Sequence, residues 1–425
     1  MAENNKPRVA CLTTFYELNP SYSLTTVVVS QLVALVKYGY KPVLFVHDNL
    51  KDDSSVPEGV EVRKVIPRFN LVDYSSHQEV SPDFWKQVDT AYEAFKENLS
   101  DIDIVLEHDL IFQGWFLPYC VAIHKLAEET NIKWFHWTHS YPNVVRDAPE
   151  PHNLRYKLPK NSKLVYLNNH DIIRAAEAYN TFPKDVRVVH NPLDPRQFWN
   201  FHPLVNSLIE KYDLLSADFV QVYPVSSTRM VGGKGLYQLI EVFAGLKRQG
   251  KNVRLVIANA HANAKNEKGT IASALSYASQ KGLNASEVIF TSLEDEPKYE
   301  SGVPREVVSQ LFQLSNVFVF PSTSENCSLI LLEAMLAGNI LILNEDVPSM
   351  REFGKENALY FGFGSIHTNR NYSDRDAYME DVAKVIISEM SNNRALKAKR
   401  DILKNYNYDI VFREQIEPLF TPLDR

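Results

Sequence analysis

The sequence predicts an α/β protein built from two parallel-sheet halves. Short apolar runs rich in β-branched residues alternate with longer segments whose apolar residues recur at helical spacing. The short runs do not alternate with polar residues, which is typical of strands that helices cover on both faces. The pattern restarts after Asn191-Pro192-Leu193-Asp194-Pro195, where two prolines interrupt it. A length of 425 residues fits two or three domains of ordinary size.

In the first half, Val28, Leu32, Leu35 and Val36 recur at helical spacing, and Gly39 follows as a helix stop. The helix is therefore expected over residues 25–38, between strands at 9–14 and 42–47. A less regular stretch, 70–100, is interpreted as a loop followed by a helix over 84–98. Further strands are expected at 102–106, 133–137, 163–167 and 186–189.

The second half repeats the alternation. Strands are expected at 218–225, 253–258, 288–291, 317–320 and 340–343, and helices at 236–249, 271–281, 305–314 and 329–336. The chain after Ser373 is expected to be helical, ending in a helix over 406–419.

Composition excludes several classes of protein. The chain is 45% hydrophobic and 23% charged, as soluble globular proteins are, so a disordered or fibrous chain is excluded. A formal net charge of −7 disfavours nucleic acid and acidic membranes as partners. No apolar run has the length of a signal peptide or a membrane span. Three scattered cysteines, Cys11, Cys120 and Cys327, favour a reducing compartment, so a cytoplasmic location is expected.

The strongest motif is the segment from Pro321 to Met335. A strand ends in a polar turn and a helix begins near Ser328, which suits an N-cap. Beyond the carboxyl end of a parallel strand, a helix N-terminus offers N–H groups to an anion such as a diphosphate. Glu325 and Glu333 could accept hydrogen bonds from sugar hydroxyls. The alternative is that both are surface charges beside a helix start.

A second motif, Ser227 to Gly235, follows the first strand of the second half. Arg229 and Lys234 lie five residues apart in a glycine-rich turn, where they could neutralise a diphosphate from two sides. The spacing is not that of a P-loop. The alternative is a solvated basic loop. Both motifs should lie at the same edge of one sheet.

Together these residues resemble a known family. The segment 228–235 resembles the G-R-L-x-x-x-K-G segment of family-4 retaining glycosyltransferases of the GT-B fold, and Glu325 and Glu333 match that family's E-x7-E motif. The segment from His190 to Phe198 is similar to its P-N-G-V-D-x-x-x-F segment. Trp137-Thr138-His139 is similar to its T-x-H, and the closing segment 406–419 resembles its final helix.

The resemblance implies a GT-B fold, in which two Rossmann-like parallel-sheet domains face each other across a cleft. Residues 1–195 would form the acceptor domain, with a helix over 405–425 crossing back to it, and 196–404 the donor domain. The implied co-substrate is a UDP- or GDP-sugar, and no metal is required. The implied reaction retains the anomeric configuration by front-face attack, in which the leaving phosphate accepts the proton of the acceptor.

The resemblance also implies roles for residues. Arg229 and Lys234 would hold the diphosphate and stabilise the leaving group, while Glu325 would contact the donor sugar and Glu333 the ribose. His139 would contact the donor sugar or the acceptor. The other donor-side candidates are Asn326, Cys327, Ser328, Leu329 and Thr228, with Ser21 and Ser23 in a loop that lacks the family's usual glycines. The acceptor-side candidates are His108, Tyr22 and Tyr141.

Two further features, the segment from Asp101 to Asp103 and the side chain of His136, are expected to have structural roles. Asp101-Ile102-Asp103 has the form of a metal-binding D-x-D but opens a strand, at the end away from the expected cleft. His136 should face away from His139. Four functions remain open: a glycosyltransferase, a degenerate GT-B scaffold, a phosphorylase or epimerase, and a transferase acting on nucleic-acid bases. The acceptor is also open between a glycan, a small molecule, a protein and a nucleic acid.

Overall fold

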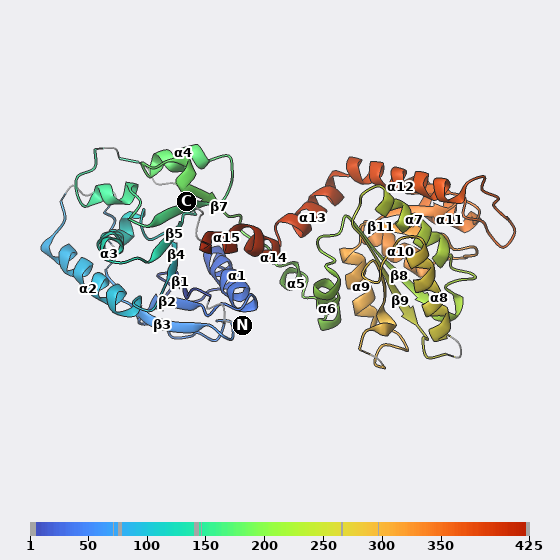
Figure 1. Ribbon diagram of the computed structural model, residues 1–425, viewed down its shortest axis with the longest axis horizontal. Coiled ribbons are helices and arrows are strands. Elements are labelled where there is room, and N and C mark those ends of the chain that lie inside the picture. Colours follow the sequence, from blue (N-terminus) through green and yellow to red (C-terminus); the bar gives the residue numbers. More distant parts are fainter. Residues whose placement is uncertain are drawn as a thin grey trace. The chain divides into compact units, whose positions relative to one another are not determined.

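The computed structural model describes residues 6–70, 72–74, 79–139, 144–145, 147–264, 267–295 and 297–421. The chain divides into two compact units, shown in Figure 1. Unit 1 comprises Met1–Asp194 and Tyr406–Arg425, and unit 2 comprises Pro195–Asn405. Every strand pairing in both units is parallel among the described residues. The predicted class, α/β with two Rossmann-like parallel-sheet domains, is confirmed.

Unit 1 contains a seven-stranded sheet in the order β3-β2-β1-β4-β5-β6-β7. The strands are β1 (Val9–Leu12), β2 (Val43–His47), β3 (Glu61–Ile66), β4 (Ile104–His108), β5 (Lys133–Trp137), β6 (Ser162–Tyr166) and β7 (Val186–Val188). β4 starts two residues later than expected, so His108 closes this strand and does not follow it. Edge strand β3 was not predicted.

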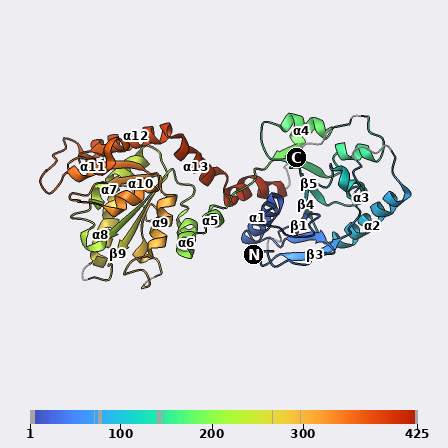
Figure 2. The same ribbon diagram turned by 180° about the vertical axis from the view of Figure 1, so that it is seen from behind.

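Helices cover both faces of this sheet, as Figure 2 shows from behind. The helices are α1 (Ser23–Lys37), α2 (Pro82–Asn98), α3 (Leu117–Glu129) and α4 (Ile172–Ala178), with 3-10 turns η1 (Gly114–Phe116), η2 (His152–Tyr156) and η3 (Pro183–Asp185). Alternate strand residues point to opposite faces. Ala10 and Leu12 of β1 accordingly pack with α2, α3 and α4, whereas Val9 and Cys11 pack with α1 and the C-terminal segment.

The C-terminal segment is not the single helix that the sequence predicts. It consists of α14 (Tyr408–Val411), the π-helical turn η7 (Phe412–Ile416) and α15 (Glu417–Phe420). Asn407 starts it by accepting a hydrogen bond from the backbone N–H of Ile410 at 3.1 Å. The ring of Phe412 stacks on Tyr38 at the end of α1, with centroids 4.7 Å apart. This segment therefore completes the apolar core on one face of unit 1.

Unit 2 contains two three-stranded sheets, β10-β9-β8 and β11-β12-β13. The strands are β8 (Phe219–Ser226), β9 (Val253–Ala260), β10 (Val288–Phe290), β11 (Val317–Phe320), β12 (Ile340–Asn344) and β13 (Leu359–Phe361). The helices are α5 (Pro195–Phe198), α6 (Pro203–Tyr212), α7 (Leu236–Arg248), α8 (Glu267–Gln280), α9 (Arg305–Leu314), α10 (Leu329–Leu336), α11 (Pro348–Gly354), α12 (Arg375–Asn392) and α13 (Arg394–Asn405), with 3-10 turns η4 (Ser227–Arg229), η5 (Thr291–Leu293) and η6 (Lys355–Asn357).

Side chains join these two sheets where β8 meets β11. The fully buried amide of Gln221 donates to the carbonyl of Val319 at 2.9 Å and accepts from the N–H of the same residue at 2.8 Å. Asn316 and Ser315 accept hydrogen bonds from two further β8 N–H groups, at 3.0 and 2.9 Å. The six strands therefore form one layer in the order β10-β9-β8-β11-β12-β13.

In unit 1, β2 and β3 lie on one side of β1, whereas β4 and the later strands lie on its other side. In unit 2, β9 and β10 lie on one side of β8, and β11 to β13 lie on the other. The strand order therefore changes sides between β1 and β4 and between β8 and β11. Such topological switch points are the usual ligand sites of open α/β sheets, beyond the carboxyl ends of the strands. Among the residues that the structure describes, no helix is long and apolar enough to cross a membrane.

Candidate functional site

Two loops of unit 2 meet at its switch point. One follows β8 and contains η4, Arg229 and Lys234, and the other follows β11 and leads into α10. The N–H of Thr323 donates to the carbonyl of Gly233 at 3.1 Å, and the hydroxyl oxygen of Ser322 lies 3.1 Å from the same carbonyl. The prediction that these two motifs share one sheet edge is confirmed.

Gly235 allows this close approach. It has a left-handed φ of +68°, and a Cβ atom at this position would lie 2.5 Å from the carbonyl oxygen of Pro321. The left-handed φ would strain most residues with a side chain, and the clash with Pro321 excludes a Cβ atom unless the backbone moves. The glycine therefore sets the distance between the loop that carries the cations and the loop that carries the carboxylate.

The central contact across the two loops is an ion pair between Lys234 and Glu325. The exposed fractions of the two side chains are 16% and 11%. The hydroxyl of Ser322 donates to the same Glu325 oxygen at 2.8 Å. Because the pair is shielded from water, its two charged groups are held in a defined geometry. Each group gives up its partner readily only for another charged or strongly polar group.

Arg229 differs from Lys234. Its side chain is exposed at the end of η4, and its guanidinium has no hydrogen bond or ion pair among the described residues. Its carbonyl accepts the N–H groups of Gly233 and Lys234, both at 3.2 Å, which fixes the backbone of the turn. Among the described residues, Arg229 is thus an unpaired cation on an ordered turn, close in sequence to the paired cation Lys234.

The helix α10 begins at this edge. Ser328 occupies the N-cap position with φ −89° and ψ 112°, but its side chain makes no capping hydrogen bond. The predicted capping role of the Ser328 side chain is therefore wrong, and its hydroxyl satisfies none of the N–H groups of the first turn. The side chains of Asn326, Cys327 and Leu329 are exposed around this helix start.

Glu333 lies further along α10 and is partly exposed. It pairs with Arg305 of α9 at 2.9 Å, although the Arg305 side chain is 82% exposed. An ion pair this open to solvent contributes at most about 1 kcal/mol. Glu333 is therefore held loosely and can exchange Arg305 for a hydroxyl-bearing ligand.

Three polar residues at this edge were not predicted. The hydroxyl of Ser226 lies 2.9 Å from that of Thr228 and 3.3 Å from Nδ1 of His261. The buried amide of Asn259 donates to Ser227 at 3.0 Å and thereby ties the end of β9 to η4. Asn259 lies at the end of β9, the neighbour of β8, and His261 follows this strand directly. Their position at the carboxyl end of a predicted strand could have identified them from the sequence.

Unit 1 has a pocket of about 440 Å³ at its own switch point. Its walls come from the loop between β1 and α1 and from the segment after β4. The lining residues are Thr13, Thr14, Phe15, Tyr16, Glu17, Asn19, Tyr22, Leu24, His108, Asp109, Gln113 and Phe116. Two of the acceptor-side candidates, Tyr22 and His108, are therefore brought together.

Three side chains form a chain of hydrogen bonds beside this pocket. Nε2 of His108 lies 3.0 Å from Oε1 of Gln31, and Nδ1 of His108 lies 3.2 Å from Nε2 of His139. If Gln31 accepts through this oxygen, His108 carries its proton on Nε2 and accepts from His139. Burial lowers the pKa of His108 and brings the pKa of His139 down to about 4. Both imidazoles are therefore neutral at pH 7.

Two carboxyl groups flank His108. Burial raises the pKa of Glu107 to about 8 and that of Asp109 to about 7. Nδ1 of His136 lies 2.7 Å from Glu107, and its Nε2 lies 3.0 Å from the hydroxyl of Ser162. The prediction that His136 faces away from His139 is confirmed, because His136 lies in the interior with Glu107. The sequence analysis did not single out Glu107 or Asp109.

The remaining candidates lie elsewhere. Ser21 and Ser23 are exposed in unit 1 and do not line its pocket, whereas the other donor-side candidates belong to unit 2. Tyr141 lies outside the described residues.

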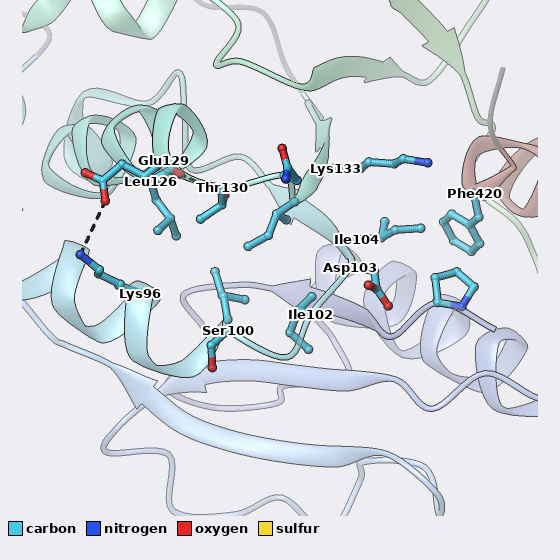
Figure 3. A pocket seen from close by; sticks show the side chains of 14 residues that line it. Lys96, Ser100, Ile102, Asp103, Ile104, Leu126, Glu129, Thr130, Lys133 and Phe420 are labelled. Carbon is cyan, nitrogen blue, oxygen red and sulfur yellow. Dashed lines mark hydrogen bonds and ion pairs between the residues drawn. The ribbon is translucent and has the colours of Figure 1, made fainter. Parts of the chain in front are cut away.

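A larger pocket of about 870 Å³ lies at the opposite, amino-terminal edge of the unit 1 sheet (Figure 3). Asp103 and Lys133, at the strand starts, and Phe420 of α15 line it, and Lys96 pairs with Glu129 at its rim at 3.6 Å. The adjacent Asp101 pairs with Arg8 and Arg63, both at 2.7 Å. The D-x-D segment therefore has the structural role that the sequence predicts. In the described part of the chain, no cluster of three His, Cys, Asp or Glu residues could hold a metal ion.

The fold and this edge define the class of protein to which the chain is similar. Two parallel α/β units with polar loops at their switch points place ligand sites beyond the carboxyl ends of the strands. A model of the family "Glycosyl transferases group 1" matches residues 221–402, less than half of the chain but most of unit 2. No curated protein matches the chain by sequence.

Several solved structures are similar over nearly the whole chain. One is a glycosyltransferase from Rickettsia africae, at 14% identity, with 98% of each chain covered and a TM-score of 0.37. Another, from E. coli, is described as trehalose-6-phosphate bound with UDP-2-fluoro glucose, at 13% identity, with 98% and 100% covered and a TM-score of 0.38. A third is Anabaena Alr3699/HepE in complex with UDP, at 14% identity, with 97% and 99% covered and a TM-score of 0.33. At these TM-scores the similarities carry no weight for the chemistry of the chain.

Proposed function

We propose that this protein is a retaining glycosyltransferase that moves a sugar from a UDP- or GDP-sugar to an acceptor. The main observation is the junction of the 227–235 and 321–328 loops at the switch point of unit 2. Lys234 pairs with Glu325 there, Arg229 lies on the same loop as Lys234, and α10, which carries Glu333, begins after the second loop, all inside the region that matches the glycosyltransferase model. A nucleotide sugar combines a diphosphate with hydroxyl groups, and this set of groups complements both.

In the proposed complex, the exposed guanidinium of Arg229 binds the diphosphate directly. Lys234 contributes by turning from Glu325 to a phosphate oxygen, which frees the Glu325 carboxylate for a hydroxyl of the donor sugar. The α10 helix start, at Asn326 to Leu329, offers backbone N–H groups and the positive end of a helix dipole. Glu333 exchanges the exposed Arg305 for the ribose hydroxyls.

The chemical step breaks the bond between the anomeric carbon and the diphosphate oxygen, while an acceptor oxygen bonds to the same carbon on the same face. The leaving phosphate takes the proton of the acceptor hydroxyl. Negative charge therefore grows on the diphosphate in the transition state, where the preorganised cations stabilise it. With Arg229 and Lys234 in this role, the reaction requires no metal ion.

We place the acceptor on unit 1, at the pocket beside His108 and Tyr22. His139 is neutral and donates its Nε2–H to His108, so its Nδ1 is left to accept a hydrogen bond from a hydroxyl of a reacting sugar. The three free cysteines, two of them buried, favour a cytoplasmic location.

Cys327 offers a direct test of the donor site, because it is the exposed thiol among three whereas Cys11 and Cys120 are buried. Maleimide labelling of the native protein should therefore report on Cys327, and Cys327→Ser should abolish the signal. We expect UDP or GDP and their sugar conjugates to slow labelling equally with EDTA or magnesium. Arg229→Ala should remove this protection, whereas Lys397→Ala, which deletes an exposed cation on α13, should preserve it.

The reaction itself is tested by product analysis. The anomeric configuration of the product, read by NMR from its coupling constant, should match that of the donor. Inversion of configuration would contradict the proposed mechanism. A requirement for inorganic phosphate would instead identify a phosphorylase.

One observation favours a second candidate, a binding protein on a degenerate fold. The loop from Tyr16 to Leu24 contains no glycine, so its backbone is less free than that of a glycine-containing loop to adopt left-handed angles near a phosphate. Absence of nucleotide protection at Cys327 at millimolar concentrations would favour this candidate over the enzyme.

A further inference from the structure

The pocket of unit 1 has a mixed lining whose chemistry identifies a ligand class. Its volume of about 440 Å³ lies within the range of small-molecule sites. Of the residues that the structure describes, twelve line it, and none of these is Lys or Arg. The lining includes the carboxyl groups of Glu17 and Asp109, and His108 is kept neutral by burial. A phosphorylated or carboxylated ligand would find no cation there, so the pocket suits an uncharged molecule.

The polar side of the pocket is built around Asp109. This side chain is 8% exposed, and its residue has a left-handed φ of 62°. One carboxyl oxygen, Oδ1, accepts the N–H of His139 at 2.9 Å, and the backbone N–H of Asp109 donates to the carbonyl of Trp137 at 3.0 Å. Among the described residues, the other oxygen, Oδ2, has no hydrogen-bond partner. A buried, oriented acceptor is thus left for a donor group of a ligand.

Aromatic side chains also line the pocket. Tyr16 and Tyr22 are 59% and 53% exposed, so their rings are open to a ligand. Tyr22 packs edge-on against the buried Phe15, with ring centroids 6.3 Å apart, so its orientation is supported from behind. Phe116 completes the wall. Flat aromatic faces bind the C–H faces of sugar rings, whose hydroxyl groups point outward to polar partners.

We propose that this pocket binds an uncharged saccharide, the acceptor of the transfer, with a hydroxyl on Oδ2 of Asp109 and a sugar ring against Tyr16, Tyr22 and Phe116. The role as acceptor rests on the proposed function. Thr14, Asn19 and Gln113 supply further hydrogen-bonding groups around the ring. The absence of lysine and arginine from the lining disfavours a nucleic-acid acceptor, whose phosphates need cations.

Saturation-transfer difference NMR on the full chain tests the proposal. The probes are methyl glucosides, methyl mannosides, maltose and N-acetylglucosamine, each compared with its 6-phosphate where one exists. We expect binding of at least one uncharged sugar, with the strongest signals on ring C–H protons, and at least tenfold weaker binding of its phosphorylated form. Tighter binding of the phosphorylated sugar or of an oligonucleotide would overturn the proposal.

Two variants locate the site. Asp109→Asn keeps the shape of the side chain and suits a left-handed backbone, so the protein should fold. It should weaken sugar binding at least tenfold, because an amide replaces the carboxylate acceptor. Tyr22→Ala should do the same, whereas Phe182→Ala, which removes an exposed aromatic ring elsewhere on unit 1, should not.

Protection of Cys327 by nucleotide separates this proposal from the proposed function. Protection that persists in Asp109→Asn while sugar binding is lost supports both. Nucleotide protection without sugar binding in the wild-type protein overturns the acceptor pocket and leaves the donor site standing. Sugar binding without nucleotide protection overturns the transferase, and the pocket then stands as a sugar-binding site alone.

Discussion

The two units share the strand order of the Rossmann fold but stabilise it with different chemistry. In unit 1, the polar side chains that tie neighbouring strands are titratable, as in the Glu107–His136–Ser162 chain across β4, β5 and β6. In unit 2, the corresponding ties are amides, with Gln221 joining β8 to β11 and Asn259 joining β9 to η4. The switch points differ as well, because unit 2 places cations there, whereas the described residues that line the pocket of unit 1 include no Lys or Arg.

This contrast shows that one topology allows two independent choices. The strand order fixes where a ligand can bind, and the loop residues decide which charge it carries. The buried polar side chains that link neighbouring strands decide how the stability of each unit depends on pH.

The largest effect is expected from removing a cation of unit 2. Arg229→Ala should lower kcat of sugar transfer by roughly 100- to 1000-fold, since mutation of one preorganised group at developing charge has this size of effect. Steady-state transfer assays measure it, with Lys397→Ala as the charge-matched control. Equal losses in both variants would show that net charge matters and position does not.

Gly235 should matter more than any other glycine of its loop. Gly235→Ala combines left-handed strain with a clash against the backbone of Pro321, so the free energy of unfolding of unit 2 should fall by roughly 2–4 kcal/mol. Gly232→Ala is the matched control, because a Cβ atom there meets nothing within 4 Å. Urea unfolding of both variants compares them. Similar stability of the two variants would contradict the packing described at Pro321.

The seam between β8 and β11 should depend on one amide. Gln221→Leu leaves the N–H and the carbonyl of Val319 without their side-chain partner, which should cost about 2–3 kcal/mol. Gln280→Leu, on the exposed face of α8, is the control. Hydrogen exchange at Val319, slow in the wild-type protein, should accelerate in Gln221→Leu. Unchanged protection would show that the seam does not need this side chain.

The smallest effect is the pH dependence of unit 1. Burial raises the pKa of Glu107 to about 8 and lowers that of His136 to about 3, so the folded pair holds one proton between these limits. In the unfolded chain, the two groups together hold two protons below about pH 4.5, where the Glu107 carboxyl titrates. They hold one proton between about pH 4.5 and 6.5, and none above about pH 6.5, where the His136 imidazole has titrated. The unfolded chain binds fewer protons above pH 6.5, so the contribution of the pair to stability falls from pH 6.5 to 8. The expected slope is about 1.4 kcal/mol per pH unit.

Tryptophan fluorescence measures this loss, because Trp85, Trp115, Trp134 and Trp137 belong to unit 1 and only Trp199 to unit 2. Glu107→Gln keeps the hydrogen bonds without a titrating carboxyl. It should reduce the fall in urea midpoint between pH 6.5 and 8. The Gln221→Leu variant of unit 2 should retain that fall in full, and its disappearance there would contradict the assignment to unit 1.

The sequence predicted most buried elements, since continuous apolar runs and helical periodicity follow from burial itself. The predicted bounds of β5, β11, α9 and α10 agree with the structure. Edge strand β3 was missed because the charged residues Glu61, Arg63 and Lys64 interrupt its sequence and only Ile66 is buried, so no apolar run marks it. α11 is only seven residues long, too short to display a period.

At the site, the motifs and their common sheet edge could be predicted, but their pairings could not. Lys234 and Glu325 are far apart in the chain, and they meet because Gly235 packs on Pro321. Nothing in the local pattern around Glu107 indicates that a histidine from the next strand points at it. Asp109 became a candidate only when its backbone angle and its unpaired oxygen were visible.

The return of the chain to unit 1 has a consequence for biosynthesis. Residues 408–420 complete one apolar face of unit 1 through Tyr408, Val411, Phe412, Ile416 and Phe420, and they follow the whole of unit 2 in the chain. While the ribosome makes Pro195–Asn405, the face built by β1 and α1 remains uncovered. Unit 2, a continuous segment, can reach its final core first. Unit 1 therefore cannot complete its core until the chain after unit 2 has been made, so the N-terminal half is not the first part that can finish folding.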